Sequence, residues 1–211
     1  MKTVFKVLVG LAAVLLAYLT FMSVYTPVQF DKKQTEREKL IEKRLKKIAN
    51  YEAAFENVYG RYATGPELVS FLENGKVFYV NAEGEYTDAM REKGLTEKQA
   101  AAQGLIKRDT TWINAKDSLV KDNTDITDLL NVPGVSGKTI AVDTAYIQQI
   151  VGVDTIAVPV FQASVKFEDY LGDLDKVRLQ QKVTQAKSKA HGFPGLKIGS
   201  LTEVKNTGNW E

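Results

Sequence analysis

The first part of the chain is an uninterrupted apolar segment, and a strongly charged segment follows it directly. Residues 7–25 contain no charged side chain. Their polar residues are Tyr18, Thr20, Ser23 and Tyr25. A helix needs about 20 apolar residues to cross the hydrocarbon core of a bilayer. A buried helix of a soluble protein would normally show one polar face, and this segment shows none. The pattern predicts a transmembrane anchor over residues 1–26.

A secretory signal peptide is the alternative interpretation, because Lys2 and Lys6 precede the apolar segment. A signal peptide has a shorter apolar core and ends at a site with small residues. The sequence SVYTPVQF at the end of the segment has no Ala-x-Ala site, so we expect the anchor to be retained. The chain has no cysteine to which a lipid could be attached.

The charges on the two sides of the anchor give opposing indications of its orientation. Lys2 and Lys6 form a short basic tail without an acidic residue, and tails of this kind in export signals stay inside the cell. A count of basic residues alone would place the C-terminal part in the cytoplasm. The basic residues that follow the anchor are Lys32, Lys33, Arg37 and Lys39. We expect a single-pass inner-membrane protein whose C-terminal part lies in the periplasm.

Residues 27–60 have the pattern of an amphipathic helix that continues from the anchor as a stalk. Apolar residues recur at intervals of three and four, and Glu52 interrupts them. These stripe residues are Ile41, Leu45, Ile48, Phe55 and Tyr59. The stripe is about three turns long, which is short for a coiled coil, so we expect it to pack on the chain's own domain, with a partner as the alternative. Pro27 is expected to break or bend the helix, and Gly60 to end it.

Residues 61–211 are long enough for one soluble domain. Thr64 with Glu67 and Thr96 with Gln99 form capping boxes that predict two short helices. Alternating apolar residues predict strands, with a change of alternation beside Pro159 that suggests a bulge, a bend or an edge strand. The strands are expected at 76–82, 105–114, 138–147, 154–167 and 196–204, and a late helix at 173–190. The class is therefore α+β, with a small antiparallel sheet and short helices after the N-terminal helix.

Three segments invite a chemical interpretation, and each has a plainer one. PGVSGKT at 133–139 lacks the first glycine of a phosphate-binding loop and precedes a strand, so it is typical of a turn. DNTDITD at 122–128 has acidic residues three apart and no glycine, unlike a calcium loop. His191 is the single histidine of a chain without cysteine, so a zinc site has no pair of ligands. We predict no catalytic, cofactor-binding or metal-binding residue, and hence no enzyme.

The balance of charge also argues against nucleic acid as a partner. The net charge is +2, and the basic residues 43–47 are mixed with acidic residues, as is normal on an exposed helix. The partners that we expect are membrane lipid and either other envelope proteins or further copies of the chain.

Three short sequences resemble a family of single-pass membrane proteins from Bacteroidetes. They are GRY at 60–62, KRDT at 107–110 and GNWE at 208–211, and the resemblance runs over nearly the whole chain. It implies a location in the membrane and supplies no catalytic residue.

The order of elements also resembles type IV pilins and pseudopilins, in which an apolar N-terminal helix continues into an amphipathic one and a small sheet follows. The chain departs from that family at the processing site. No glycine precedes Phe5, and Val9 stands where a glutamate would be expected. The resemblance therefore implies an architecture rather than filament assembly.

Two classes of function follow from these patterns. The first is a non-enzymatic structural or assembly subunit of a cell-envelope complex, or its narrower form, a pseudopilin-like filament subunit. The second is a module that binds an envelope ligand such as a glycan or peptidoglycan. Tyr62, Trp112 and Trp210 could stack on a sugar, although a tryptophan in a strand, as at Trp112, is more often a core residue.

Overall fold

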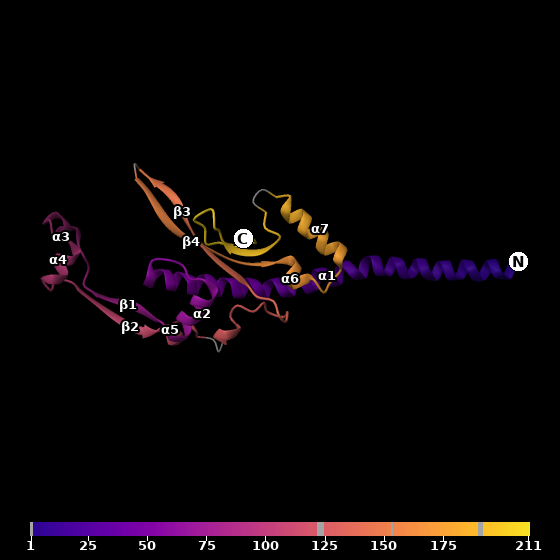
Figure 1. Cartoon of the computed structure of the whole chain (residues 1–211), viewed down its shortest axis with the longest axis horizontal. Coiled ribbons are helices and arrows are strands. Elements are labelled where there is room, and N and C mark those ends of the chain that lie inside the picture. Colours follow the sequence, from indigo (N-terminus) through magenta and orange to yellow (C-terminus); the bar gives the residue numbers. More distant parts are fainter. Residues whose placement is uncertain (1, 122–124, 153, 190–191) are drawn as a thin grey trace. The chain divides into compact units, whose positions relative to one another are not determined.

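The structure is a computed structural model that describes residues 2–121, 125–152, 154–189 and 192–211 (Figure 1). It is α+β, as the sequence predicts: a long apolar helix comes first, and small antiparallel sheets with short helices follow. The helices are α1 (Lys2–Tyr59), α2 (Gly65–Asn74), α3 (Asp88–Glu92), α4 (Glu97–Ala102), α5 (Ala115–Leu119), the 3-10 helix η1 (Ile126–Asp128), α6 (Phe167–Leu171) and α7 (Lys176–Lys187). The strands are β1 (Lys76–Glu83), β2 (Lys107–Asn114), β3 (Ala141–Val151), β4 (Asp154–Lys166) and β5 (Gly195–Gly199).

Helix α1 is a single helix that includes both the predicted anchor and the predicted stalk. The expected break at Pro27 is wrong, because the helix continues through this residue. Proline removes one backbone hydrogen bond, and the turns on both sides of it hold the helix together. Gly60 ends α1 as predicted, with φ at +69° and its N–H donating to the carbonyl oxygen of Glu56 over 2.7 Å. Of the described residues, α1 is the one helix long and apolar enough to cross a membrane.

The folded chain forms two compact units. The first unit comprises Met1–Ala49, Leu130–Ile147 and Val160–Glu211. The three-stranded sheet has the order β3–β4–β5, and within this unit β4 and β5 are antiparallel, with Ala163 opposite Ile198 and Val165 opposite Leu196. These four side chains are buried, and helix α6 packs against β5 and α7.

The second unit comprises Asn50–Leu129 and Gln148–Pro159. Strands β1 and β2 form an antiparallel ladder, and α2 packs against α5 and η1. The two predicted capping boxes are confirmed at the starts of α2 and α4. The rings of Phe55 and Phe71 meet edge to face, with their centroids 5.1 Å apart, and both side chains are buried.

The strand expected at 154–167 is present as β4, which runs through Pro159, and the change in its sequence pattern marks the point where exposed residues give way to buried ones. Two other predicted boundaries in the C-terminal part are wrong. Helix α7 begins later than expected because the side chain of Asp175 accepts a hydrogen bond from the N–H of Arg178 and so caps the helix. Strand β5 ends early at Gly199, whose φ is +79° and whose missing Cβ would collide with the carbonyl oxygen of Phe161.

Candidate functional site

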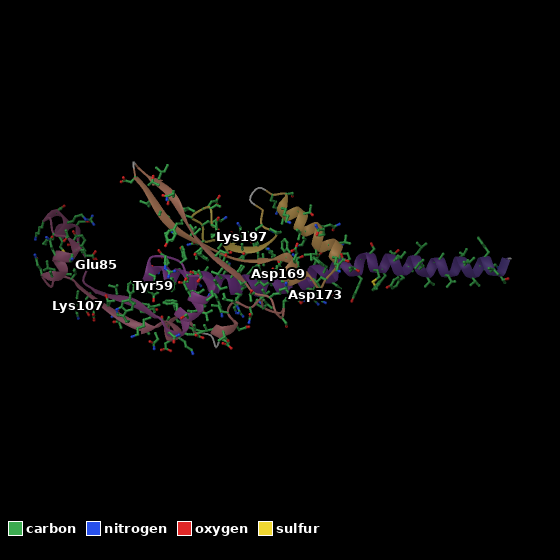
Figure 2. All side chains as sticks on the ribbon, in the orientation of Figure 1. Tyr59, Glu85, Lys107, Asp169, Asp173 and Lys197 are labelled. Atoms are coloured by element: carbon green, nitrogen blue, oxygen red, sulfur yellow. The ribbon has the colours of Figure 1, made fainter. Side chains whose placement is uncertain are left out.

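The apolar stripe of α1 is covered by the chain itself over most of its length. Ile41, Leu45 and Ile48 are fully buried, and Phe55 is 4% exposed. Tyr59 is 55% exposed at the end of the helix, where Figure 2 labels it, and its ring centroid lies 4.5 Å from that of Phe55. Tyr59 is therefore the stripe residue that remains accessible to a partner.

A polar brace joins α1 to α6 and to the turn that follows it. The hydroxyl of the fully buried Tyr170 donates to Oε1 of Glu38 over 2.9 Å, and Nε2 of Gln34 donates to the same oxygen over 2.6 Å. Arg37 donates to the carbonyl oxygen of Tyr170 over 2.5 Å and to both carboxylate oxygens of Asp173 over 2.5 and 2.8 Å. Figure 2 shows Asp173 beside α1. We call these five residues the brace.

The pKa values of three brace residues favour the protonation states that their hydrogen bonds require. Burial raises the pKa of Tyr170 well above its ordinary value, and the negative charge of Glu38 adds to the effect. The hydrogen bonds from Arg37 lower the pKa of Asp173 and raise that of Arg37 itself. Because the side chain of Asp173 is 58% exposed, this ion pair contributes less than about 1 kcal/mol. The brace is a structural connection between α1 and the residues of α6 and the turn after it.

Glu52 is a buried acid within the stripe. One of its oxygens, Oε2, accepts a hydrogen bond from the N–H of Ala63 over 2.8 Å. The other, Oε1, is buried and has no hydrogen-bond partner among the described residues. The pKa of Glu52 is raised to about 7, chiefly by burial and to a smaller extent by the charge of Glu67, against the lowering effects of the N–H of Ala63 and the charge of Arg61. The residue that interrupts the stripe in the sequence thus secures the turn between α1 and α2.

The same turn has an ion pair on its outer side. Arg61 donates two hydrogen bonds to the carboxylate of Glu67, over 3.2 and 3.0 Å, and its guanidinium carbon lies 5.3 Å from the ring centroid of Phe55. Glu67 also accepts from the N–H and the hydroxyl of Thr64. The hydrogen bonds from Arg61 are the largest cause of the pKa of Glu67 falling to about 2. This cluster holds the start of α2 in place.

The β1–β2 ladder presents an apolar surface to solvent. Phe78 lies opposite Trp112 with a distance of 5.3 Å between ring centroids, and Val80 follows on the same face. Trp112 is 54% exposed and Val80 52%. Trp112 is thus a surface residue, against the expectation of a core position, because a ladder of two strands leaves this face uncovered. We call Phe78, Val80 and Trp112 the ladder face.

No family model, curated protein or solved structure matches this chain. The three short sequences noted above can nevertheless be given structural roles. Gly60 and Arg61 form the turn after α1, and residues 107–110 begin β2. At the C-terminus, Asn209 accepts a hydrogen bond from the N–H of Lys197 and donates one to the carbonyl oxygen of Gly195, and Glu211 pairs with Lys46 over 2.9 Å.

A hollow of about 340 Å³ opens between α1, α7 and β5 in the first unit. Its lining includes Lys182, Lys189 and Lys197, together with Glu38. The Nζ atom of Lys182 lies 5.7 Å from the ring centroid of Phe167. The Nζ atom of Lys197 lies 6.0 Å from the ring centroid of Phe193. Cationic groups above aromatic rings could hold an anionic sugar or peptide. Sequence reasoning missed this cluster because its residues come from separate elements.

The structure gives roles to two of the three segments for which the sequence suggested chemistry, and the third, at His191, is not described. Residues 133–139 form a turn that leads into β3, with φ positive at Gly134 and Gly137, and Asn131 bridges Thr139 across it. Asp125 caps the 3-10 helix η1 by accepting from the N–H of Thr127 over 3.0 Å. Asp122 and His191 lie outside the described residues. Within the described ranges, no three acidic or histidine side chains gather as a metal site would require.

The three candidate stacking residues do not share a hollow. Tyr62 and Trp112 belong to the second unit, and Trp210 belongs to the first. Trp210 is half-buried, and its indole packs where a Cβ at residue 208 would stand, which explains the glycine at that position. None of the three lines the hollow that contains Lys182 and Lys197.

Proposed function

We propose that this protein is a non-enzymatic subunit, anchored in the inner membrane, that assembles with other proteins of the cell envelope. The anchor is the apolar first part of α1, in which Val14 is 70% exposed and Leu15 58%. Side chains of this kind need lipid or another protein around them, because a contiguous apolar surface of this size is unfavourable in water.

The observation that carries the proposal is the ladder face. A ladder of two strands is marginally stable in water and gains stability when its apolar face is covered. Tryptophan and phenylalanine are enriched in the centres of protein interfaces, where they contribute most of the binding energy. The opposite face has an apolar pair, Val77 and Ile113, of which Val77 is buried. Beyond this pair its contacts are polar: Nδ2 of Asn81 donates to Oγ1 of Thr111, and Tyr79 hydrogen-bonds Ser118. The ladder face is therefore suited to a protein partner, and the part of the opposite face around Thr111 to water.

The test uses a photo-crosslinking amino acid at position 112 in the full chain in living cells. Trp112 on the ladder face should crosslink to another envelope protein, and Thr111 on the opposite face of the same strand should not. A crosslink between two copies of the chain would support the self-assembling, pseudopilin-like form of the proposal. Equal crosslinking at both positions, or at neither, would contradict a role for this face.

The proposed location of both folded units is the periplasm, in agreement with the short basic tail of Lys2 and Lys6. Ser136 is exposed, and the chain has no cysteine. A Ser136→Cys variant should therefore react with an impermeant maleimide in cells whose outer membrane has been opened. Reaction only after lysis of the inner membrane would show that the count of basic residues was the better guide.

A second candidate function is the binding of an anionic envelope glycan or peptidoglycan fragment, and the lysine-lined hollow of the first unit favours it. Lys182 and Lys197 would pair with carboxylates, while the rings of Phe167 and Phe193 would lie against the sugar or peptide. Titration with soluble peptidoglycan fragments should show binding that a Lys182→Gln variant weakens and a Lys187→Gln variant, also on α7, does not. Equal binding by the two variants would remove this candidate.

A further inference from the structure

A second hollow, of about 320 Å³, lies where the turn between α6 and α7 meets α1. Helix α1 contributes Met22, Tyr25, Thr26, Gln29, Phe30 and Lys33. The turn contributes Leu174 and Asp175. All of these residues belong to the first unit. Phe30 is 3% exposed, whereas Val28, two residues earlier, is 57% exposed, so this part of α1 is covered by protein on one side only.

The position of this hollow along α1 relates it to the membrane surface. The predicted apolar segment ends at Tyr25, residues 26–30 are also uncharged, and the first charged residues after them are Asp31, Lys32 and Lys33. At 1.5 Å per residue, the eight residues from Tyr25 to Lys33 rise about 12 Å, which is enough to cross one headgroup layer of about 5–8 Å. The hollow is therefore apolar at the hydrocarbon end and charged at the aqueous end.

The first turn of α7 has the composition of a helix that rests on a lipid surface. Val177 is 66% exposed, and the basic residues Lys176 and Arg178 stand on either side of it. The whole helix, KVRLQQKVTQAK, contains four basic residues and no acidic residue. An exposed apolar residue among basic ones favours the boundary between acyl chains and headgroups. Leu174 and Asp175, which directly precede this helix, are the two residues that the turn contributes to the lining of the hollow.

We propose that this hollow binds a membrane phospholipid, with its phosphate at Lys33 and an acyl chain along Met22 and Tyr25, and that Val177 rests on the same leaflet. The proposal rests on the membrane anchor of the proposed function and adds a second contact with the bilayer. Two contacts, one through α1 and one through α7, fix the tilt and the rotation of the first unit relative to the membrane. A single helical anchor would leave the rotation of that unit about the axis of α1 unrestricted by lipid.

The first experiment measures the depth of three positions in the full chain. Because the chain has no cysteine, the variants Val177→Cys, Val14→Cys and Val204→Cys can each carry one environment-sensitive fluorophore. The protein is placed in vesicles of phosphatidylethanolamine and phosphatidylglycerol that contain lipids with a nitroxide on the headgroup or on the acyl chain. We expect quenching at position 177 by the headgroup nitroxide and at position 14 by the acyl-chain nitroxide. Val204, which is 57% exposed on a loop of the first unit, should be quenched by neither.

This experiment distinguishes a failure of the proposed lipid site from a failure of the proposed membrane anchor. If position 14 is quenched and position 177 behaves like position 204, the anchor stands and the second contact is wrong. If position 14 is not quenched by the acyl-chain nitroxide, the anchor itself is wrong, and the lipid site fails with it.

The second experiment tests the hollow itself by mass spectrometry of the full chain released gently from detergent. One phospholipid should remain bound, and Lys33→Gln should lower its occupancy about fivefold, since one basic residue near a phosphate contributes about that factor. Lys39→Gln, an exposed lysine on the same helix that does not line the hollow, should leave it unchanged. Equal loss in both variants, or no loss in either, would show that lipid binds without using the hollow.

Discussion

The two halves of α1 are both rich in apolar residues, yet the folded chain covers only one of them. Leu15, in the first half, is 58% exposed, and Leu45, in the second half, is fully buried. Both leucines lie on the same continuous helix. The chemistry of the side chain therefore does not decide which half the protein covers. The arrangement of the neighbouring residues does.

In the first half, apolar residues occupy every side of the helix, so no side is set apart for packing against protein. In the second half, one side of the helix carries Lys43, Lys46 and Lys47 and lies in water. The other side carries the buried residues Ile41 and Leu45. A helix that is apolar all round is suited to lipid, and a helix with one apolar stripe is suited to a protein core. The comparison predicts that the same kind of substitution will have different consequences in the two halves.

The largest expected effect on folding is in the second half. Leu45→Ala removes a fully buried side chain and should lower the free energy of unfolding by about 2–5 kcal/mol. The matched control is Leu40→Ala, on the same helix at a position that is 52% exposed, which should change it by less than about 0.5 kcal/mol. Denaturant unfolding of the full chain in detergent, followed by circular dichroism, measures both. If Leu45→Ala is as stable as the control, the stripe is not part of the folded core.

Glu52, in the second half of α1, should make the free energy of unfolding depend on pH. Its pKa is about 7 in the folded chain against an ordinary value of 4.5, so between these pH values the folded state keeps a proton that the unfolded state has released. The free energy of unfolding should therefore fall as pH rises from 4.5 to about 7, by an amount on the order of 3 kcal/mol. Above that window the loss is complete.

A Glu52→Gln variant cannot titrate and should lose most of this slope, whereas Glu56→Gln, one turn further along α1, should keep it. The measurement is the free energy of unfolding at several pH values for the three proteins. Parallel pH profiles for the parent and Glu52→Gln would mean that another group carries the dependence.

Local sequence signals predicted much of the fold. The capping boxes at Thr64 and Thr96, the terminating Gly60 and the β-forming run before Glu83 each act within a few residues, and each marks an element that the structure contains. Pro27 misled the prediction because its local preference is overcome by the helix on both sides of it. The start of α7 was placed too early, at residue 173, because the capping role of Asp175 was not recognised.

The candidate surfaces were less predictable because they combine residues that are far apart in the sequence. In the brace, Arg37 and Asp173 are separated by 136 positions, and no periodic pattern connects them. The ladder face depends on the pairing of Phe78 with Trp112, which a reading of either strand alone does not supply. The hollow lined by Phe30 and Leu174 could not be predicted because the two residues come from separate elements of the chain.

The first half of α1 should respond to charge through the membrane rather than through the fold. Leu15→Arg places a charge in the middle of the apolar segment, where insertion becomes less favourable by about 3 kcal/mol. We expect a larger fraction of the protein in the soluble fraction, with the circular dichroism of the folded part unchanged. Leu15→Ala serves as the control and should remain in the membrane. Loss of folded structure in Leu15→Arg would contradict the division of the helix into a lipid half and a protein half.

The smallest expected change in stability is in the brace, which lies at the start of the half of α1 that packs against protein. Tyr170→Phe removes the hydroxyl that donates to Glu38 while keeping the ring that fills the buried space. A hydrogen bond to a charged group contributes about 1.5–3 kcal/mol, and Glu38 keeps a second donor, Gln34, so the loss should lie near the lower value. Tyr146→Phe, at a position that is 63% exposed, should leave the free energy of unfolding unchanged. Because burial and the charge of Glu38 hold the pKa of Tyr170 well above its ordinary value, the hydroxyl stays protonated in the folded chain, and the difference between parent and variant should not vary between pH 7 and 9, where tyrosine is also protonated in the unfolded chain. A difference that changes within this range would mean that another titrating group controls the hydrogen bond from Tyr170.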